Sequence, residues 1–295
     1  MQFLAYILIY PFLWLISLMP FRLLYLFSDF FYVLLYYIIG YRRKTVKENL
    51  KLAFPNVSDA ELKKISQKFY HHMCDMFLEM IKSLTISRKQ LNKRFIIKNP
   101  ERLQQLERLN KSIVVMYGHY ASYEWSFVVE NHISLKGIGI YKTIANKYFD
   151  NLVRKIRSRY NTELIDTKKA VAKIAEYEEQ GIKSAIAFLS DQSPKNFKKY
   201  YWTHFMNIEV PCFTGAEKIA KDLDLSVAYL KIEKVKRGHY EAEFITLAEN
   251  ARAYPDYEIT DKFTKELEKQ IYQAPEFYLW THKRWKHRGK KPVTA

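Results

Sequence analysis

A histidine and a glutamate stand close together where the sequence leaves an apolar run. His119 follows Ser112 to Tyr117, which is short, apolar and β-branched and so predicts a buried strand. Four residues separate it from Glu124, which precedes a short predicted helix at residues 126–131 with Ser122 as its N-cap. A Glu124 carboxylate that reached back to the imidazole would fix its tautomer and leave the other ring nitrogen free to accept a proton. With no serine or cysteine nucleophile in the pattern, we predict that His119 activates a substrate hydroxyl or amine directly.

Other interpretations of these residues stay open. A histidine at the end of a strand can serve only to cap the next helix. A metal-dependent hydrolase built on His119 and Glu124 lacks a second histidine at ligand spacing. A further polar group, His71, His72, Cys74 and Asp75, lies in a predicted helix, where adjacent histidines point in different directions. We therefore expect no metal site and no bound cofactor.

The rest of the chain alternates between strand and helix patterns. Strands are predicted at 112–117, 136–141, 163–166, 184–189, 225–235 and 239–247, and helices at 45–52, 58–80, 146–159, 168–179, 213–222 and 257–274. This alternation predicts an α/β fold, a single catalytic domain with a central sheet flanked by helices. His119 would then lie at the carboxyl edge of the sheet, where ligands bind in such folds.

The N-terminal region is apolar enough to enter a membrane. Residues 1–21 carry no charge, which is about the length of a spanning helix, and residues 30–39 are apolar again. Arg42, Arg43 and Lys44 follow, and such clusters favour the cytoplasmic side. We predict a hydrophobic membrane-anchoring helix within residues 1–40 and a catalytic domain over residues 41–295. Whether the second stretch spans the bilayer or lies in its interface stays open. The alternative that the apolar segment is a buried core helix of the protein also stays open.

The charge balance favours acidic partners. The chain has 48 Lys and Arg against 31 Asp and Glu, a net charge of +17, and aromatic residues make up 16% of it. The basic C-terminal tail, with Trp280 and Trp285 between its charges, fits a membrane surface of anionic lipid. A membrane-tethered, non-enzymatic protein that binds nucleic acid is the rival interpretation. It would leave the His119 and Glu124 pair unexplained, so we expect no nucleic acid.

Several separated segments carry a resemblance to one family. They are Tyr41-Arg42-Arg43, Asn49-Leu50, Phe54-Pro55, Gly118-His119 with Glu124, Tyr141-Lys142, Asn146, Arg157, Asp191-Gln192, Thr214-Gly215 and the motif from Pro275 to Arg284. In these the chain resembles the bacterial lipid A biosynthesis (late) acyltransferases of the lysophospholipid acyltransferase superfamily. It departs from them at Ser122-Tyr123, where the family usually has Asn-Trp, and at Lys142, where Arg is frequent.

The resemblance implies an enzyme on the cytoplasmic face of the bacterial inner membrane. It would move a fatty acyl chain from acyl carrier protein, its co-substrate, to a hydroxyl of a lipid A precursor. His119 would be the general base and Glu124 would orient it, while a lysophospholipid or an aminolipid remains an alternative acceptor.

Four further residues are candidates for substrate binding. Arg157 would hold a phosphate, since a guanidinium matches phosphate oxygens in pairs, and Asp191, Lys142 and Asn146 would lie nearby. Each of two of these residues has an alternative role without substrate contact. Arg157 could be a solvated charge on a helix face, and Asp191 could form a turn beside Pro194.

Overall fold

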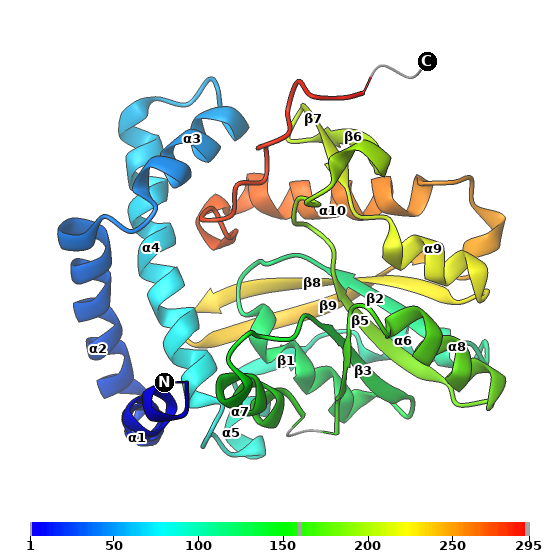
Figure 1. Cartoon of the computed structure of the whole chain (residues 1–295), viewed down its shortest axis with the longest axis horizontal. Coiled ribbons are helices and arrows are strands. Elements are labelled where there is room, and N and C mark those ends of the chain that lie inside the picture. The colour runs from blue at the N-terminus through cyan, green and yellow to red at the C-terminus, as the bar shows by residue number, and fades with distance from the viewer. Residues whose placement is uncertain (1, 159–160, 293–295) are drawn as a thin grey trace.

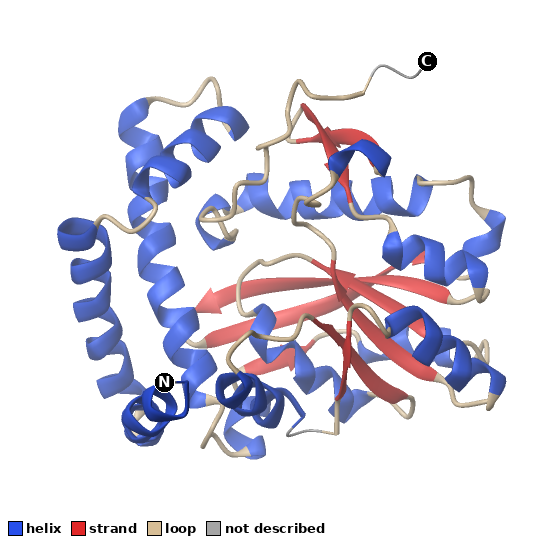
Figure 2. Cartoon of the chain, in the orientation of Figure 1, coloured by secondary structure: helices blue, strands red, loops and turns tan. Residues whose placement is uncertain are grey.

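The fold is built on a seven-stranded sheet with helices on both sides of it (Figures 1 and 2). The computed structural model describes residues 2–158 and 161–292. The strands of this sheet lie in the order β1 (Phe95–Ile97), β9 (His239–Ala248), β8 (Ser226–Lys236), β2 (Ile113–Tyr117), β5 (Ser184–Leu189), β3 (Lys136–Tyr141) and β4 (Glu163–Asp166). All neighbouring pairs are parallel except β8 and β9, which form a hairpin. This confirms the predicted α/β class.

The first helices, up to Asn92, precede the first strand, and the later helices alternate with the strands of the sheet. In chain order these helices are α1 (Gln2–Leu18), α2 (Phe21–Val33), the π-helix η1 (Leu34–Ile39), α3 (Arg43–Ala53), α4 (Asp59–Lys82), α5 (Arg88–Asn92), α6 (Pro100–Glu107), α7 (Lys147–Arg157), α8 (Ala170–Glu179), α9 (Gly215–Asp222) and α10 (Glu258–Gln273). Two short 3-10 helices, η2 (Tyr123–His132) and η6 (Pro275–Phe277), flank the region of His119. A small separate hairpin joins β6 (Tyr201–Phe205) to β7 (Ile208–Cys212).

Several local details differ from the sequence predictions. The short strand β1, the helices α5 and α6 and the β6–β7 hairpin were not predicted, because their segments are too short for a periodic signal. The predicted helix at 126–131 is the 3-10 helix η2, and the buried Ser122 hydroxyl does not cap it and has no hydrogen-bond partner among the residues that the structure describes. The predicted end of the helix at Arg159 lies outside the described residues, and α7 ends at Arg157.

The central strand β2 explains where the site forms. All five of its residues are buried, as expected for a strand with parallel neighbours and both faces covered. Helices α9 and α10 pack against β2 and β8, and α6 packs against β9. The carboxyl ends of β2 and β5 therefore meet at one edge of the sheet, from which the loop that carries His119 departs.

The apolar N-terminal region forms two helices, and the second has the length of a membrane span. Residues Phe21–Ile39 form one helical segment that is apolar enough to cross a bilayer, whereas the first apolar segment, Tyr6–Leu18, is shorter. By length and composition the second segment is therefore the candidate span, and which of the two stretches crosses a bilayer stays a prediction. Most large apolar side chains of both helices are exposed, among them Leu8, Phe12, Leu26, Phe30 and Ile38. The helices are therefore candidate anchors that present an uncovered apolar surface.

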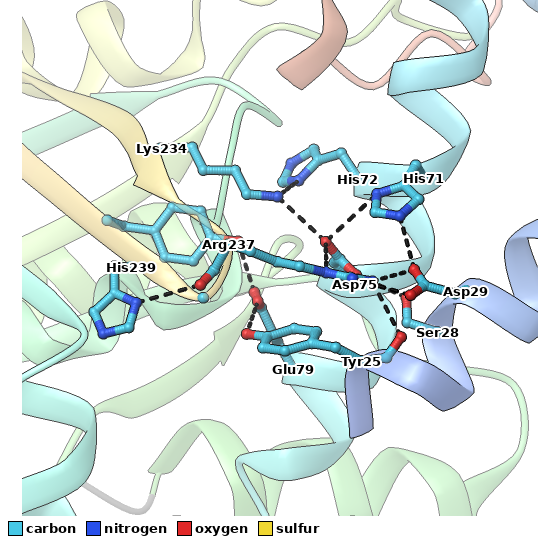
Figure 3. A network of polar contacts seen from close by, with 12 residues as sticks. Tyr25, Ser28, Asp29, His71, His72, Asp75, Glu79, Lys234, Arg237 and His239 are labelled. Carbon is cyan, nitrogen blue, oxygen red and sulfur yellow. Dashed lines mark hydrogen bonds and ion pairs between the residues drawn. The ribbon is translucent and has the colours of Figure 1, made fainter. Parts of the chain in front are cut away.

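A polar network attaches helix α2 to α4 and to the β8–β9 hairpin (Figure 3). Asp75 of α4, fully buried, accepts a hydrogen bond from Ser28 of α2 at 2.8 Å. Arg237, at the turn of the β8–β9 hairpin, donates to Asp75 at 2.7 Å and to Asp29 of α2 at 2.5 Å. One arginine therefore joins three elements, and burial of Asp75 is compensated by the charges and donors around it.

Glu79, one turn further along α4, extends this attachment. Its two carboxylate oxygens accept hydrogen bonds from Tyr25 of α2 at 2.8 Å and from Tyr240 of β9 at 2.7 Å. Complete burial raises the pKa of Glu79 to about 7. The sequence alone left this residue unexplained, and the structure shows that it joins the same three elements as Arg237.

Candidate active site

The register of two parallel strands brings His119 and Asp191 together. Tyr117 on β2 pairs with Leu189 on β5, and each chain continues two residues beyond that pair. The Nδ1 atom of His119 lies 2.7 Å from Oδ1 of Asp191. A carboxylate can only accept, so Nδ1 carries the proton and Nε2 keeps its lone pair. The amide nitrogen of Gln192 lies 3.3 Å from Nε2 and donates to it.

The charges around His119 make it a stronger base than a free histidine. Burial opposes its protonation, but the Asp191 carboxylate outweighs burial and raises the pKa of His119 above the usual value. Burial likewise acts against the charged form of Asp191, and the neighbouring His119 nevertheless holds the pKa of that carboxyl below its usual range. The pair is a base held in one orientation by a charged partner.

Glu124 lies near His119 but does not orient it. Its two oxygens accept hydrogen bonds from Arg157, at 3.1 Å from Nε and at 2.6 Å from Nη2. The prediction that Glu124 binds the imidazole is therefore wrong in geometry, because Asp191 occupies Nδ1 and Arg157 holds both Glu124 oxygens. Ala121, with a left-handed φ of 49°, turns the chain between them. Any role of Glu124 in catalysis remains a prediction.

The C-terminal motif closes the other side of the His119 loop. The backbone N–H of Leu279 donates to the carbonyl of His119 at 3.1 Å, and that of Ala121 donates to Phe277 at 2.9 Å. His282 accepts a hydrogen bond from the backbone N–H of Ser193 at 3.0 Å. Burial lowers the pKa of His282 to about 4, so this ring stays neutral and serves as an acceptor. The motif that carried part of the family resemblance thus holds the loops of both His119 and Asp191.

Close packing requires glycine beside the histidine. A Cβ atom on Gly118 would lie 2.7 Å from Leu267 Cδ1, and Leu267 is fully buried in α10. Any larger residue at position 118 would therefore push the His119 loop away from α10.

The remaining predicted binding residues lie beside the site with different functions. The Asn146 side chain caps α7 by accepting from the N–H groups of Tyr148 and Phe149. The side chain of Lys142 is exposed in the loop before α7. Arg157 comes from the last turn of α7 and enters the site through its ion pair with Glu124. Of the predicted residues, the structure joins His119 with Asp191 and Glu124 with Arg157, and leaves Lys142 and Asn146 outside these contacts.

A cavity with mostly apolar walls opens next to the histidine. Its polar side is formed by Glu124, Arg157 and Tyr123, and the Tyr123 ring packs edge-on against the His119 ring with 4.9 Å between centroids. Its walls come from β2, β3, β4 and β5 and from the region of η2, with Val115, Ile138, Ile140, Leu164, Ala185, Ala187, Leu189, Phe127 and Ile133. The alanines on β5 take up little of this space, and the glycines on β3 make room for the side chains of Glu130 and Leu164 that line it. Sequence patterns gave no signal for the cavity, because it depends on which strands are neighbours.

Comparison with known proteins places the chain in a family. The sequence model of the bacterial lipid A biosynthesis acyltransferases matches residues 1–287. The chain belongs to this family. It is therefore an acyltransferase, and the resemblance carried by its sequence motifs is confirmed.

Two curated proteins with related names are similar to the chain at low identity. The chain is similar to a lipid A biosynthesis palmitoleoyltransferase of Escherichia coli (strain K12) and to a lipid A biosynthesis acyltransferase of Shigella flexneri. Each is 22% identical over 249 residues, which cover 84% of this chain and 79% of the relative. At this distance the family acyltransferase activity is shared, and the site in this chain has to be argued from its own residues.

Proposed function

We propose that the protein transfers a fatty acyl chain from the thioester of acyl carrier protein to a hydroxyl of a lipid A precursor. The observation that supports this most directly is the pairing of His119 with Asp191 beside an apolar cavity. Within the described residues, no serine, threonine or cysteine hydrogen-bonds to His119. This favours direct attack by the acceptor over a covalent acyl-enzyme.

The proposed reaction needs one base and one site for negative charge. Nε2 of His119 takes the proton of the acceptor hydroxyl while the hydroxyl oxygen attacks the carbonyl carbon of the thioester. Asp191 stabilises the imidazolium that forms, and backbone N–H groups at the start of η2 are the candidate donors to the oxyanion. The carbon–sulfur bond then breaks, and the imidazolium returns its proton to the departing thiolate. The products are an ester and the free thiol of the carrier, so no cofactor is required.

The acceptor assignment rests on the family and on the surroundings of the site. Both curated relatives are named for lipid A biosynthesis. Arg157 uses Nε and Nη2 to hold Glu124, and within the described residues Nη1 makes no hydrogen bond, so we propose Nη1 as the contact for an acceptor phosphate. Helix α1 packs on α7, with the rings of Phe3 and Tyr148 5.2 Å apart, so the apolar anchor adjoins an element that carries Arg157. We place the protein on the cytoplasmic face of the inner membrane, where a lipid acceptor would reach the site from the bilayer.

A direct assay separates the acceptors. Purified full-length protein is mixed with acyl-charged carrier protein and with a lipid A precursor, a lysophospholipid or an aminolipid in turn, and products are read by mass spectrometry. We expect transfer to the lipid A precursor. Transfer to another acceptor with none to the lipid A precursor would overturn the acceptor assignment, and transfer from acyl-coenzyme A alone would overturn the carrier assignment.

The apolar cavity predicts a change in acyl-chain selection. Ala187 lies on β5 and lines the cavity, opposite Val115 in the strand register. Ala187→Phe should fill part of this space and shift the preferred donor to a shorter acyl chain, because the longer chain can no longer be accommodated. The measurement is competition between carrier proteins charged with chains of different length. The control Ala172→Phe adds the same ring to an exposed position on α8 and should leave the preference for acyl-chain length unchanged. An unchanged preference in Ala187→Phe would mean that the acyl chain binds outside this cavity.

A further inference from the structure

A basic hollow lies away from the histidine, between α3, α4 and the π-helix η1. It has a volume of about 450 Å³, and Tyr36, Leu50 and Leu62 form its apolar floor. Its rim is lined by Arg43, Lys44, Lys47, Lys51, Lys63, Ser66 and Asp59. None of these residues takes part in the site described above, so the hollow needs an explanation of its own.

The positive charges of the hollow are largely uncompensated. Five basic residues and one acidic residue line it, and Asp59 is paired with Lys51 at 3.0 Å. Within the described residues, no ion pair involves Lys44, Lys47 or Lys63. The guanidinium of Arg43 lies 4.7 Å from the centre of the Tyr36 ring, which fixes its position without neutralising it.

The spacing of these charges costs the helix stability. Arg43, Lys47 and Lys51 follow one another at four-residue steps on α3, and like charges at that spacing repel each other. A bound anion would relieve the repulsion. A phosphate group, with several acceptor oxygens and up to two negative charges, suits a ring of lysine and arginine donors.

The neighbours of the hollow indicate where the phosphate comes from. Tyr36 belongs to the segment Phe21–Ile39, and the next residues Tyr37, Ile38 and Ile39 expose 55%, 73% and 59% of their surface. This uncovered apolar end adjoins the basic rim, an arrangement that matches the boundary between lipid tails and head groups. A flat acidic protein surface would leave a concave space of this size unfilled, whereas one head group with its glycerol can enter it.

We propose that the hollow between α3 and α4 binds the phosphate head group of an anionic phospholipid of the inner leaflet. The site is distinct from the acyl-transfer site and does not depend on which acceptor the enzyme uses. It would hold the protein on anionic membrane at the junction of its anchor and its catalytic domain.

The test is a pair of charge reversals in the full-length protein. Lys44→Glu with Lys47→Glu changes two exposed residues of the hollow, and Lys218→Glu with Lys265→Glu makes the same charge change at exposed positions of α9 and α10. Binding is measured by flotation with vesicles of phosphatidylcholine alone and with vesicles that also contain the anionic lipid phosphatidylglycerol. We expect the preference for phosphatidylglycerol to fall at least about 25-fold in the first variant, because each basic residue at such a surface contributes about five-fold. The control variant should keep most of the preference.

Further arms of the experiment separate the possible ligands. Inorganic phosphate at millimolar concentration should not compete, since it lacks the glycerol and the bilayer that hold the head group in place. Full competition by inorganic phosphate would indicate a site for a free anion and overturn the lipid assignment. Equal loss of preference in both variants would indicate net charge alone, and loss of carrier-protein binding with phosphatidylglycerol preference intact would assign the hollow to that protein. Each of these three results contradicts the proposal.

Discussion

His119→Ala should lower acyl transfer by about 100- to 10,000-fold, the usual contribution of a general base. Nε2 is the ring nitrogen that keeps its lone pair, because Nδ1 donates to Asp191. Without the imidazole, the acceptor hydroxyl would have to lose its proton to water. The measurement is single-turnover transfer from acyl-charged carrier protein under saturating acceptor.

The fold should survive this replacement. The contacts that hold the loop use the backbone of His119, whose carbonyl accepts from Leu279, and these do not need the imidazole. A thermal unfolding midpoint close to that of the wild type, together with lost turnover, supports the proposed base. Wild-type turnover in His119→Ala would contradict the mechanism.

Asp191→Asn should lower the rate of acyl transfer by up to about 10,000-fold. The side-chain amide of the new asparagine can donate a hydrogen bond to Nδ1 of His119. This would favour the other tautomer, in which Nε2 carries the proton and can no longer act as the base. The remaining activity should also change its dependence on pH. Activity requires neutral His119 and so rises with pH through the pKa of that residue. Asp191 holds this pKa above its usual value, so removing the carboxylate should move the acidic limb of the pH profile to lower pH.

Glu124→Gln is the matched control, since it removes one carboxylate from the same neighbourhood. Arg157 holds both oxygens of Glu124. Glu124→Gln should therefore move the acidic limb of the pH–activity profile less than Asp191→Asn does. A structural defect alone would lower the rate in either variant without moving the limb. If Glu124→Gln gave the larger displacement, Glu124 and not Asp191 would be the partner that tunes the histidine.

The sequence was sufficient for the class of fold but not for the partner of the histidine. Apolar β-branched runs and the alternation of strands and helices predict the α/β sheet, because these patterns are local. The choice between Glu124 and Asp191 depends on β2 and β5 being neighbours in the sheet, and strand order is a property of the whole chain. Asp191 carried one signal, a polar residue two positions beyond a strand end like His119 itself. Without the register, that signal did not distinguish an orienting carboxylate from a turn.

The N-terminal region shows the same limit. Composition predicts that residues 1–40 are apolar, but the division into α1 and the segment Phe21–Ile39 depends on the break between them and on packing against α4. Lys82 of α4 donates to the carbonyls of Ser17 and Met19 at 2.7 Å each, and so holds the end of α1. Lys82 lies more than 60 residues from these carbonyls in the sequence, so local sequence patterns could not predict that it binds the end of α1.

The attachment of α2 by Asp75, Glu79 and Arg237 has a mechanical consequence. A flexible linker would let the rest of the protein reach to variable heights above helix α2, whereas α2 shares a buried hydrogen bond with α4 and a partly exposed ion pair with the β8–β9 hairpin. The strand β8 in that hairpin is also the direct neighbour of β2, which leads to His119. His119, which we propose as the base, is thus held at a set depth relative to the apolar surface. An acceptor would have to present its hydroxyl at that depth, so the height of the site becomes a filter on which lipids can react.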